Sequence, residues 1–160
     1  MAAATFRLAC PPGITDESVA LFIEEVLSEA RFDAYLIDPE RQVLLAEEDD
    51  GTTIGYTMIV FGEPSDADVS AVVPYERAAE LSKIYVLPDR HGGSVARPLM
   101  EASLTAAAEA GAHGMWLGVN QQNVRAQRFY GKCGFTRAGT KRFWVGDHWE
   151  DDYVLIRSLT

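Results

Sequence analysis

The spacing of hydrophobic residues changes from strand-like to helical within the first 30 positions. Residues 5–9 are predicted to form a short strand. Residues 16–29 are predicted to form a helix, because their apolar side chains recur at helical spacing. The apolar face consists of Val19, Phe22, Ile23, Val26 and Leu27. The chain is therefore expected to open with a strand followed by a helix.

Two runs of β-forming residues then predict a hairpin. Residues 42–46 and 53–61 flank an acidic segment, 47–51, which is interpreted as a solvated turn. Residues 62–75 combine glycine, proline, serine and aspartate, a composition typical of a loop. A loop of this length inside a compact domain is often functional.

The second half of the chain alternates strands and helices. The expected elements are a strand at 79–87, a glycine turn at 91–94, a helix at 95–110, a strand at 115–119, a helix at 124–132 and closing strands at 135–145 and 153–159. Gly111 and Gly134 are expected to end the two helices. Because no repeat or linker divides the chain, residues 1–160 are predicted to form a single α/β domain.

Composition narrows the class of protein. With 48% hydrophobic and 24% charged residues the chain resembles a soluble globular protein, and its apolar runs are too short to cross a bilayer. No secretory signal is visible, so a cytoplasmic location is expected. The formal net charge of −10 argues against a nucleic-acid-binding surface and favours a cationic partner. The sequence does not determine the oligomeric state, and it is compatible with a homodimer.

The cysteines and histidines predict neither a disulfide nor a metal site. Cys10 and Cys133 are expected to be thiols in a reducing compartment. The three histidines, His91, His113 and His148, are far apart and lack a ligand-like spacing with the cysteines. No bound metal is therefore expected.

A glycine turn between the strand at 79–87 and the following helix predicts an anion site. Successive backbone N–H groups and the positive end of a helix dipole can hold a pyrophosphate, and small side chains allow close approach. Arg97 could add a charge-assisted contact. The candidate binding residues are His91, Gly92, Gly93, Ser94, Val95, Ala96 and Arg97. Plain helix capping is the alternative, and neither the Walker nor the dinucleotide fingerprint is present.

A second motif makes the functional prediction specific. Residues 123–135 read Asn-x-x-Ala-x-x-Phe-Tyr-x-x-x-Gly-Phe. This pattern resembles the second signature of the GNAT superfamily of acyl-CoA-dependent N-acyltransferases, and the preceding glycine turn resembles the pyrophosphate loop of that superfamily. The resemblance covers residues 80–135. The turn departs from the usual loop at His91, Ser94 and Ala96.

The resemblance implies a fold and a co-substrate. The fold would be a mixed central sheet flanked by helices and splayed between the fourth and fifth predicted strands, near Val86 and Val119. Acetyl-CoA would lie in the notch. The backbone of Ile84, Tyr85 and Val86 would pair with its pantetheine arm, and Asn123 would bind the same arm.

The resemblance also implies that Tyr130 is the general acid. Acyl transfer releases a thiolate, and a phenol with a pKa of about 10 arrives protonated at neutral pH and can serve the sulfur. The alternative is an aromatic residue packed in the core beside Phe129.

The group that accepts the amine proton is less well defined by the sequence. Glu80 is one candidate, because relatives often carry a carboxylate there; a strand-end charge paired with Lys83 or water is the alternative. Some relatives use a glutamate at the position of Gly118, so that route is expected to be closed. The remaining candidates lie in the acidic segment 145–153, which is read as a hairpin turn bordering the acceptor site.

Aromatic residues beside this turn suggest the acceptor. Phe143, Trp144 and Trp149 could contact an aliphatic or cationic molecule, although a hydrophobic strand would also explain them. The closing strands resemble those of small bacterial polyamine acetyltransferases. The predicted function is direct transfer of an acetyl group from acetyl-CoA to a primary amine of a small cationic molecule. The alternatives are a non-catalytic acyl-CoA-binding module, an acetyltransferase acting on a protein N-terminus or lysine, and an interaction protein with an acidic face.

Overall fold

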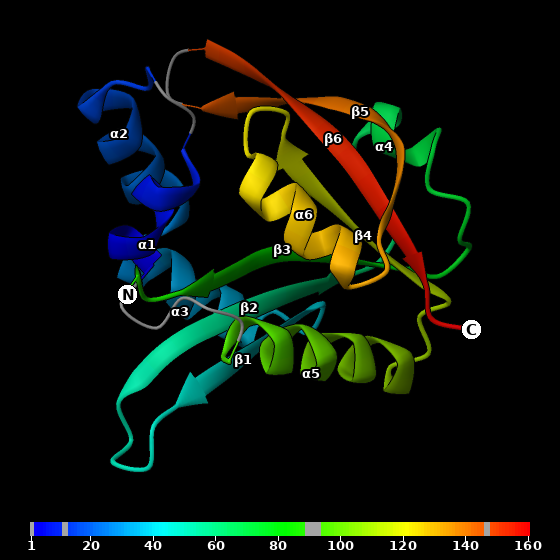
Figure 1. The fold of residues 1–160 in the computed structure, drawn as a ribbon, viewed down its shortest axis with the longest axis horizontal. Coiled ribbons are helices and arrows are strands. Elements are labelled where there is room, and N and C mark those ends of the chain that lie inside the picture. Colours follow the sequence, from blue (N-terminus) through cyan, green and yellow to red (C-terminus); the bar gives the residue numbers. More distant parts are fainter. Residues whose placement is uncertain (1, 11–12, 89–93, 146–147) are drawn as a thin grey trace.

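The computed structural model describes residues 2–10, 13–88, 94–145 and 148–160 of the chain. Within them a six-stranded sheet has the order β1-β2-β3-β4-β6-β5 and carries helices on both faces (Figure 1). The strands are β1 Arg41–Glu47, β2 Thr53–Phe61, β3 Ala78–Val86, β4 Gly114–Asn120, β5 Thr136–Val145 and β6 His148–Ser158. The helices are α1 Ala2–Ala9, α2 Asp16–Val26, α3 Glu29–Ile37, α4 Ala67–Ser70, α5 Ala96–Glu109 and α6 Val124–Lys132.

The N-terminal segment corrects the predicted first strand. Residues 5–9 belong to α1, where the Phe6 ring stacks on Phe22 of α2 with centroids 4.2 Å apart. Phe6 also packs in a cluster with Val19, Leu27 and the β3 residue Tyr85. Helical geometry lets α1 and α2 bury these side chains against each other. A five-residue sequence window contains no information about that tertiary contact.

The predicted helix at 16–29 corresponds to α2, which ends earlier than expected and is followed by α3. Thr15 caps α2 through a hydrogen bond from the backbone N–H of Ser18, 3.1 Å long. The helix ends before Leu27, and α3 follows with Ser28 at its N-cap position. The sequence did not predict α3, because its apolar Leu36 and Ile37 are exposed and make no clear amphipathic stripe. The other predicted strands and helices of the chain are confirmed, with shifted ends.

The apolar side chains of α5 recur at amphipathic spacing and pack the helix against the sheet. Its buried residues Leu99, Met100, Ser103, Leu104 and Ala107 form one face. The Ser103 hydroxyl donates to Thr57 Oγ1 of β2 at 3.0 Å, so this buried polar contact is satisfied. Both α5 and α6 pack into the main core cluster. Gly111 and Gly134, each with φ of 83°, follow these helices as predicted.

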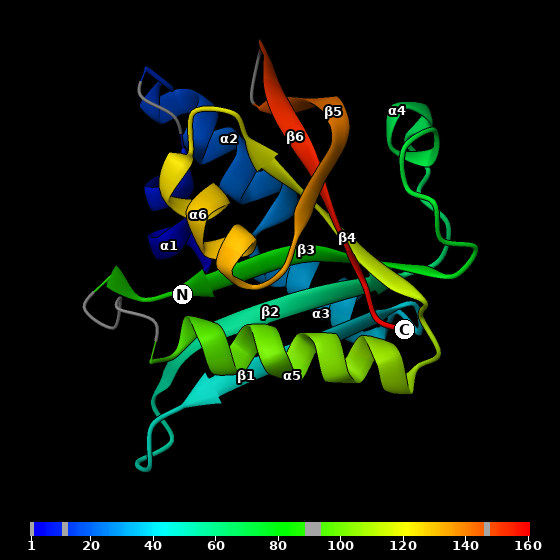
Figure 2. The same cartoon turned by 45° about the vertical axis from the view of Figure 1, so that its right-hand side comes forward.

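The sheet splays between β3 and β4, the fourth and fifth strands expected from the sequence. These strands run parallel and pair only through residues 78–80 and 114–116, whereas every other neighbouring pair is antiparallel. Beyond that point β3 continues along β2 and β4 continues along β6, so the two strands diverge toward α6 (Figure 2). The predicted mixed, splayed sheet is confirmed.

A β-bulge in β3 determines which side chains face the splay. Met58 of β2 pairs with Lys83 and the next residue, Ile59, pairs with Leu81, so Ser82 is an extra residue. An extra residue inverts the alternation of side chains along a strand. As a result Glu80 and Lys83, three positions apart, lie on the same face of the sheet.

Candidate active site

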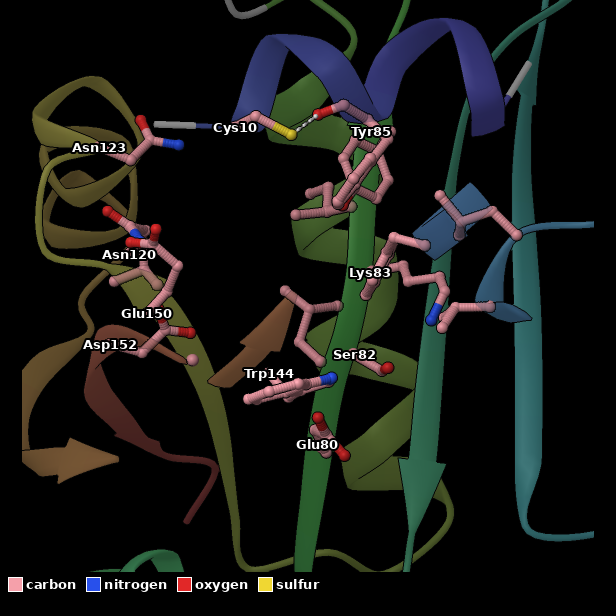
Figure 3. Close-up of a pocket in the computed structure, with 18 of the residues that line it drawn as sticks. Cys10, Glu80, Ser82, Lys83, Tyr85, Asn120, Asn123, Trp144, Glu150 and Asp152 are labelled. Atoms are coloured by element: carbon pink, nitrogen blue, oxygen red, sulfur yellow. Dashed lines mark hydrogen bonds between the residues drawn. The ribbon is translucent and has the colours of Figure 1, made fainter. Parts of the chain in front are cut away.

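A cleft of about 530 Å³ lies where β3 and β4 diverge, between the sheet and helices α1–α3 (Figure 3). Residues 80–85 of β3 and 118–120 of β4 line it. The predicted site residues that line this cleft are Glu80, Ile84, Tyr85, Asn123 and Tyr130. Val86 is buried at the end of β3 and is not part of the lining. The structure therefore brings the predicted arm-binding, acid and base candidates to one place.

The predicted pyrophosphate turn is described in part. His91, Gly92 and Gly93 lie outside the described residues. Ser94 and Val95 precede α5, which begins at Ala96, and no side chain of the described residues caps it. Its first turn also contains no acidic residue. Arg97 is exposed and its Nε atom lies 3.1 Å from Glu101 Oε1, so its charge is already partnered within the helix.

Asn123 has a structural role as well as a place in the cleft. It is the N-cap of α6, and its Oδ1 atom accepts a hydrogen bond from the backbone N–H of Ala126 at 3.0 Å. The side-chain oxygen is thus used by the helix. The Nδ2 amide group is the donor that remains for a ligand.

Tyr130 both packs among aromatic residues and lines the cleft. Its ring packs against Phe129 and Phe135, with centroid separations of 5.6 and 6.1 Å. It also lines the cleft from α6. Burial raises the pKa of the phenol well above its usual value, so the hydroxyl is protonated at neutral pH.

Glu80 lies in a region with several basic groups. Burial raises the pKa of its carboxyl group, while the charges of Lys141, Lys83 and Arg41 lower it in part. Burial lowers the pKa of Lys83 to about 8. The Lys83 ammonium and the Arg41 guanidinium lie 5.3 and 4.8 Å from the centroid of the same ring, Tyr35 of α3. This end of the cleft is basic, and the sequence did not predict it because the three residues come from separate elements.

The acidic segment after β5 is largely strand rather than turn. Asp147 lies outside the described residues, and residues 148–152 belong to β6, paired with β5. Asp152 is 7% exposed, and burial raises its pKa to about 6 despite the opposing effect of Lys141; Glu150 and Asp151 raise it further. The predicted hairpin turn is therefore wrong for Asp152, which lies on β6 and points into the cleft (Figure 3).

The aromatic residues beside this segment are also placed by the structure. The Trp144 and Trp149 rings form an edge-on pair with centroids 5.0 Å apart, and each is about half exposed. Trp144 also lines the cleft. The side chain of Phe143 lies outside the described residues. Because Trp144 is both exposed and part of the lining, it marks the mouth of the cleft.

The two cysteines are separate free thiols. Burial raises the pKa of both Cys10 and Cys133. Among the described residues, no cluster of three or more His, Cys, Asp or Glu side chains could hold a metal ion. None of the described helices has the length and apolar character needed to span a membrane.

A sheet splayed between two parallel strands, with an asparagine-capped helix that carries a tyrosine into the cleft, is the arrangement that the resemblance to acyl-CoA-dependent N-acyltransferases predicts. The family model for the acetyltransferase (GNAT) family matches residues 7–135. The chain belongs to this family.

Relatives and solved structures agree with this assignment. An uncharacterised N-acetyltransferase of Mycobacterium tuberculosis (strain H37Rv) is 47% identical over 159 residues, which cover 99% of this chain and 94% of the relative. The PaiA N-acetyltransferase of Thermoplasma acidophilum, solved with coenzyme A, has a TM-score of 0.74 at 18% identity, over 98% of this chain and 87% of that one. The spermidine N-acetyltransferase of Vibrio cholerae, solved with CoA and spermine, has a TM-score of 0.63 at 20% identity, over 82% of this chain and 73% of that one.

Proposed function

We propose that this protein transfers the acetyl group of acetyl-CoA to a primary amine of a small cationic molecule, by direct attack within a ternary complex. The observation that carries the proposal is the group of carboxylates at the notch, in a cleft that Arg41, Lys83 and Lys141 also line. Acidic side chains reach it from three elements: Glu25 of α2, Glu80 of β3, and Glu150 and Asp152 of β6. An ammonium group held there would lie beside the gap into which the acyl group enters.

The residues present suit acetyl-CoA as co-substrate. Beyond residue 80 the edge of β3 that faces β4 is no longer paired with it, so its backbone can bind the amides of the pantetheine arm. Ile84 and Tyr85 line this stretch, and the Asn123 amide group faces the same cleft. The phosphates would lie near the start of α5, whose first turn contains no acidic residue.

Tyr130 would serve the leaving sulfur. Attack of the amine breaks the C–S bond, and negative charge develops on sulfur. The Tyr130 hydroxyl, protonated because of its raised pKa, can donate a hydrogen bond and then a proton to that atom. No covalent enzyme intermediate is needed, since the amine and the thioester would be bound together.

The mixed charge of the cleft restricts how the acceptor would enter. Arg41 and Lys83 would repel a second ammonium group at the α3 end of the cleft. The acidic side chains of β6 and the Trp144 ring lie at the other wall and the mouth. We therefore expect the reacting amine to enter past Trp144, with the rest of the molecule directed outward.

An amine panel tests the proposal. Spermidine, spermine, simple diamines, amino acids and a peptide with a free lysine would each be incubated with acetyl-CoA, and thiol release would be followed. The proposal requires turnover with one or more of the small cationic amines, with intersecting initial-velocity lines for the two substrates. Turnover with neutral or anionic amines alone would refute the cationic acceptor, and parallel lines would refute direct transfer.

A further inference from the structure

Gly118 of β4 leaves a space that side chains of β5 and β6 fill. It lies two positions beyond Trp116, the last β4 residue that pairs with β3, and therefore at the start of the notch. A Cβ atom built on Gly118 would lie 2.8 Å from Lys141 Cε and 3.2 Å from Asp152 Oδ2. A side chain at this position would have to displace those atoms. The glycine thus makes room for the Lys141 side chain of β5 and for a carboxylate supplied by β6.

The backbone register holds Asp152 at this space. Asp152 pairs with Asn120 of β4 on one side and with Lys141 of β5 on the other. Its side chain is buried in the wall of the cleft opposite Glu80 and Lys83 (Figure 3). Strand pairing on both sides makes this a rigid position, which suits a group that must meet a substrate atom.

We propose that Asp152 accepts the proton of the amine nucleophile, so that the route closed by Gly118 on β4 is replaced by a carboxylate from β6. This inference rests on the proposed acetyl transfer. The ammonium group would bind beside Asp152 at the β6 wall of the cleft, and one proton would pass from nitrogen to the Asp152 carboxylate, directly or through a water molecule. The neutral nitrogen attacks the thioester carbon, the C–S bond breaks, and the sulfur takes a proton from Tyr130.

Two further proton transfers complete the reaction. The new amide nitrogen loses its second proton, which restores Tyr130, and Asp152 releases its proton to solvent. The overall reaction converts an ammonium compound and acetyl-CoA into an acetamide, free CoA and one proton. No oxidant, metal or further reactant is required.

The surrounding charges suit Asp152 for this step. The groups that influence or face it are Lys141 of β5, Glu150 and Asp151 of β6, Glu80 and Lys83 of β3, and Glu25 of α2. Burial and the two neighbouring carboxylates raise the pKa of Asp152 to about 6, and Lys141 prevents a larger rise. Asp152 is thus ionised at neutral pH and basic enough to take a proton. Glu80 lies at the closed end of the notch among three basic groups, whose positive charges favour its ionised form and oppose uptake of a proton.

A pH profile of the Asp152→Asn variant tests the inference. An amine with a pKa near that of lysine, about 10.4, is only about 0.1% neutral at pH 7.4. With spermidine as the amine, wild-type kcat/KM should rise through pH 6 and then level off. The variant should be slower at pH 7 by roughly 10²–10⁴, and its rate should keep rising with pH toward the pKa of the amine, so that the gap narrows.

Two variants provide the controls. Asp151→Asn removes the same charge from the neighbouring, exposed position of β6 and should keep the wild-type rate and plateau, with the rise at a slightly lower pH because one carboxylate that raises the pKa of Asp152 is gone. Glu80→Gln should mainly raise the KM of the amine. A wild-type profile in Asp152→Asn, or loss of the plateau in Glu80→Gln instead, would overturn the assignment while leaving acetyl transfer intact. Absence of turnover in the wild-type protein with every amine would refute the proposed function itself, and this inference with it.

Discussion

Replacing the Asp152 carboxylate should make the folded protein more stable even as it removes activity. Folding raises the pKa of this group from its ordinary value of 3.8 to about 6, because burial penalises its charged form. A shift of this size corresponds to a cost of about 3 kcal/mol for keeping the side chain ionised in the folded state at neutral pH. The attraction of Lys141 opposes the rise of the Asp152 pKa, so the net shift and the cost derived from it already include this attraction. Asp152→Asn removes the charge and should recover much of this cost.

The size of the effect depends on pH. Below about pH 4 the carboxyl group is protonated in both the folded and unfolded states, so the variant should have no advantage. As pH rises toward 7, the wild-type protein loses the stability associated with the raised pKa, and the variant does not. The difference in the free energy of unfolding should therefore grow between about pH 4 and pH 7 and then stay constant.

Urea denaturation at pH 4, 5, 6 and 8 measures this difference directly, with Asp151→Asn as the matched control. For a domain of this size, about 3 kcal/mol corresponds to roughly 6–12 °C in Tm, which thermal unfolding at pH 8 would detect. A pH-independent stability difference would refute the claim that Asp152 is buried and charged in the folded protein. So would a destabilised variant at pH 8.

Further predictions concern the remaining cleft residues. Tyr130→Phe removes only the hydroxyl and should lower kcat by roughly 10²–10⁴ with CoA affinity nearly unchanged by calorimetry; wild-type turnover would make Tyr130 a packing residue. Gly118→Ala should lower kcat by displacing Lys141 or Asp152, without altering CoA affinity. Asn123→Ala should destabilise the protein by about 1 kcal/mol through loss of the α6 cap and weaken CoA binding, whereas Asn123→Asp should keep the cap and weaken only CoA binding. The KM of the amine should rise with added salt more than that of acetyl-CoA, because exposed charges are screened beyond about 8 Å at 0.15 M.

Much of the fold could be predicted from local pattern. The β1–β2 hairpin, α5, β4 and α6 follow from hydrophobic spacing and from glycines with positive φ at helix ends. The motif at 123–135 placed Asn123 at a helix start and Tyr130 seven positions later, and both line the cleft. These features depend on interactions between residues that are close in sequence. The pattern of a single sequence is therefore enough to predict them.

The features that were missed depend on register and tertiary contact. Residues 5–9 are helical and pack on α2 through the Phe6–Phe22 stack, a tertiary contact that a short sequence window does not contain. The single extra residue Ser82 places Lys83 beside Glu80, and strand-period reasoning assigns them to opposite faces. The acidic run around Asp152 resembles a solvated turn, and only pairing with β4 and β5 buries it. From sequence alone, Gly118 indicates that β4 supplies no carboxylate at this position. In the structure, the space that it leaves is partly filled by the Asp152 carboxylate of β6.

Transfer of an acetyl group from acetyl-CoA to a small amine is tested most directly by following the group itself. The measurement uses acetyl-CoA labelled in the acetyl group, purified protein and spermidine or another amine of the panel, with both products separated and counted. The label should appear on the amine in a one-to-one ratio with released CoA, and release should stop when the amine is omitted. CoA binding without any labelled amine product would contradict acetyl transfer and would identify the chain as a binding module.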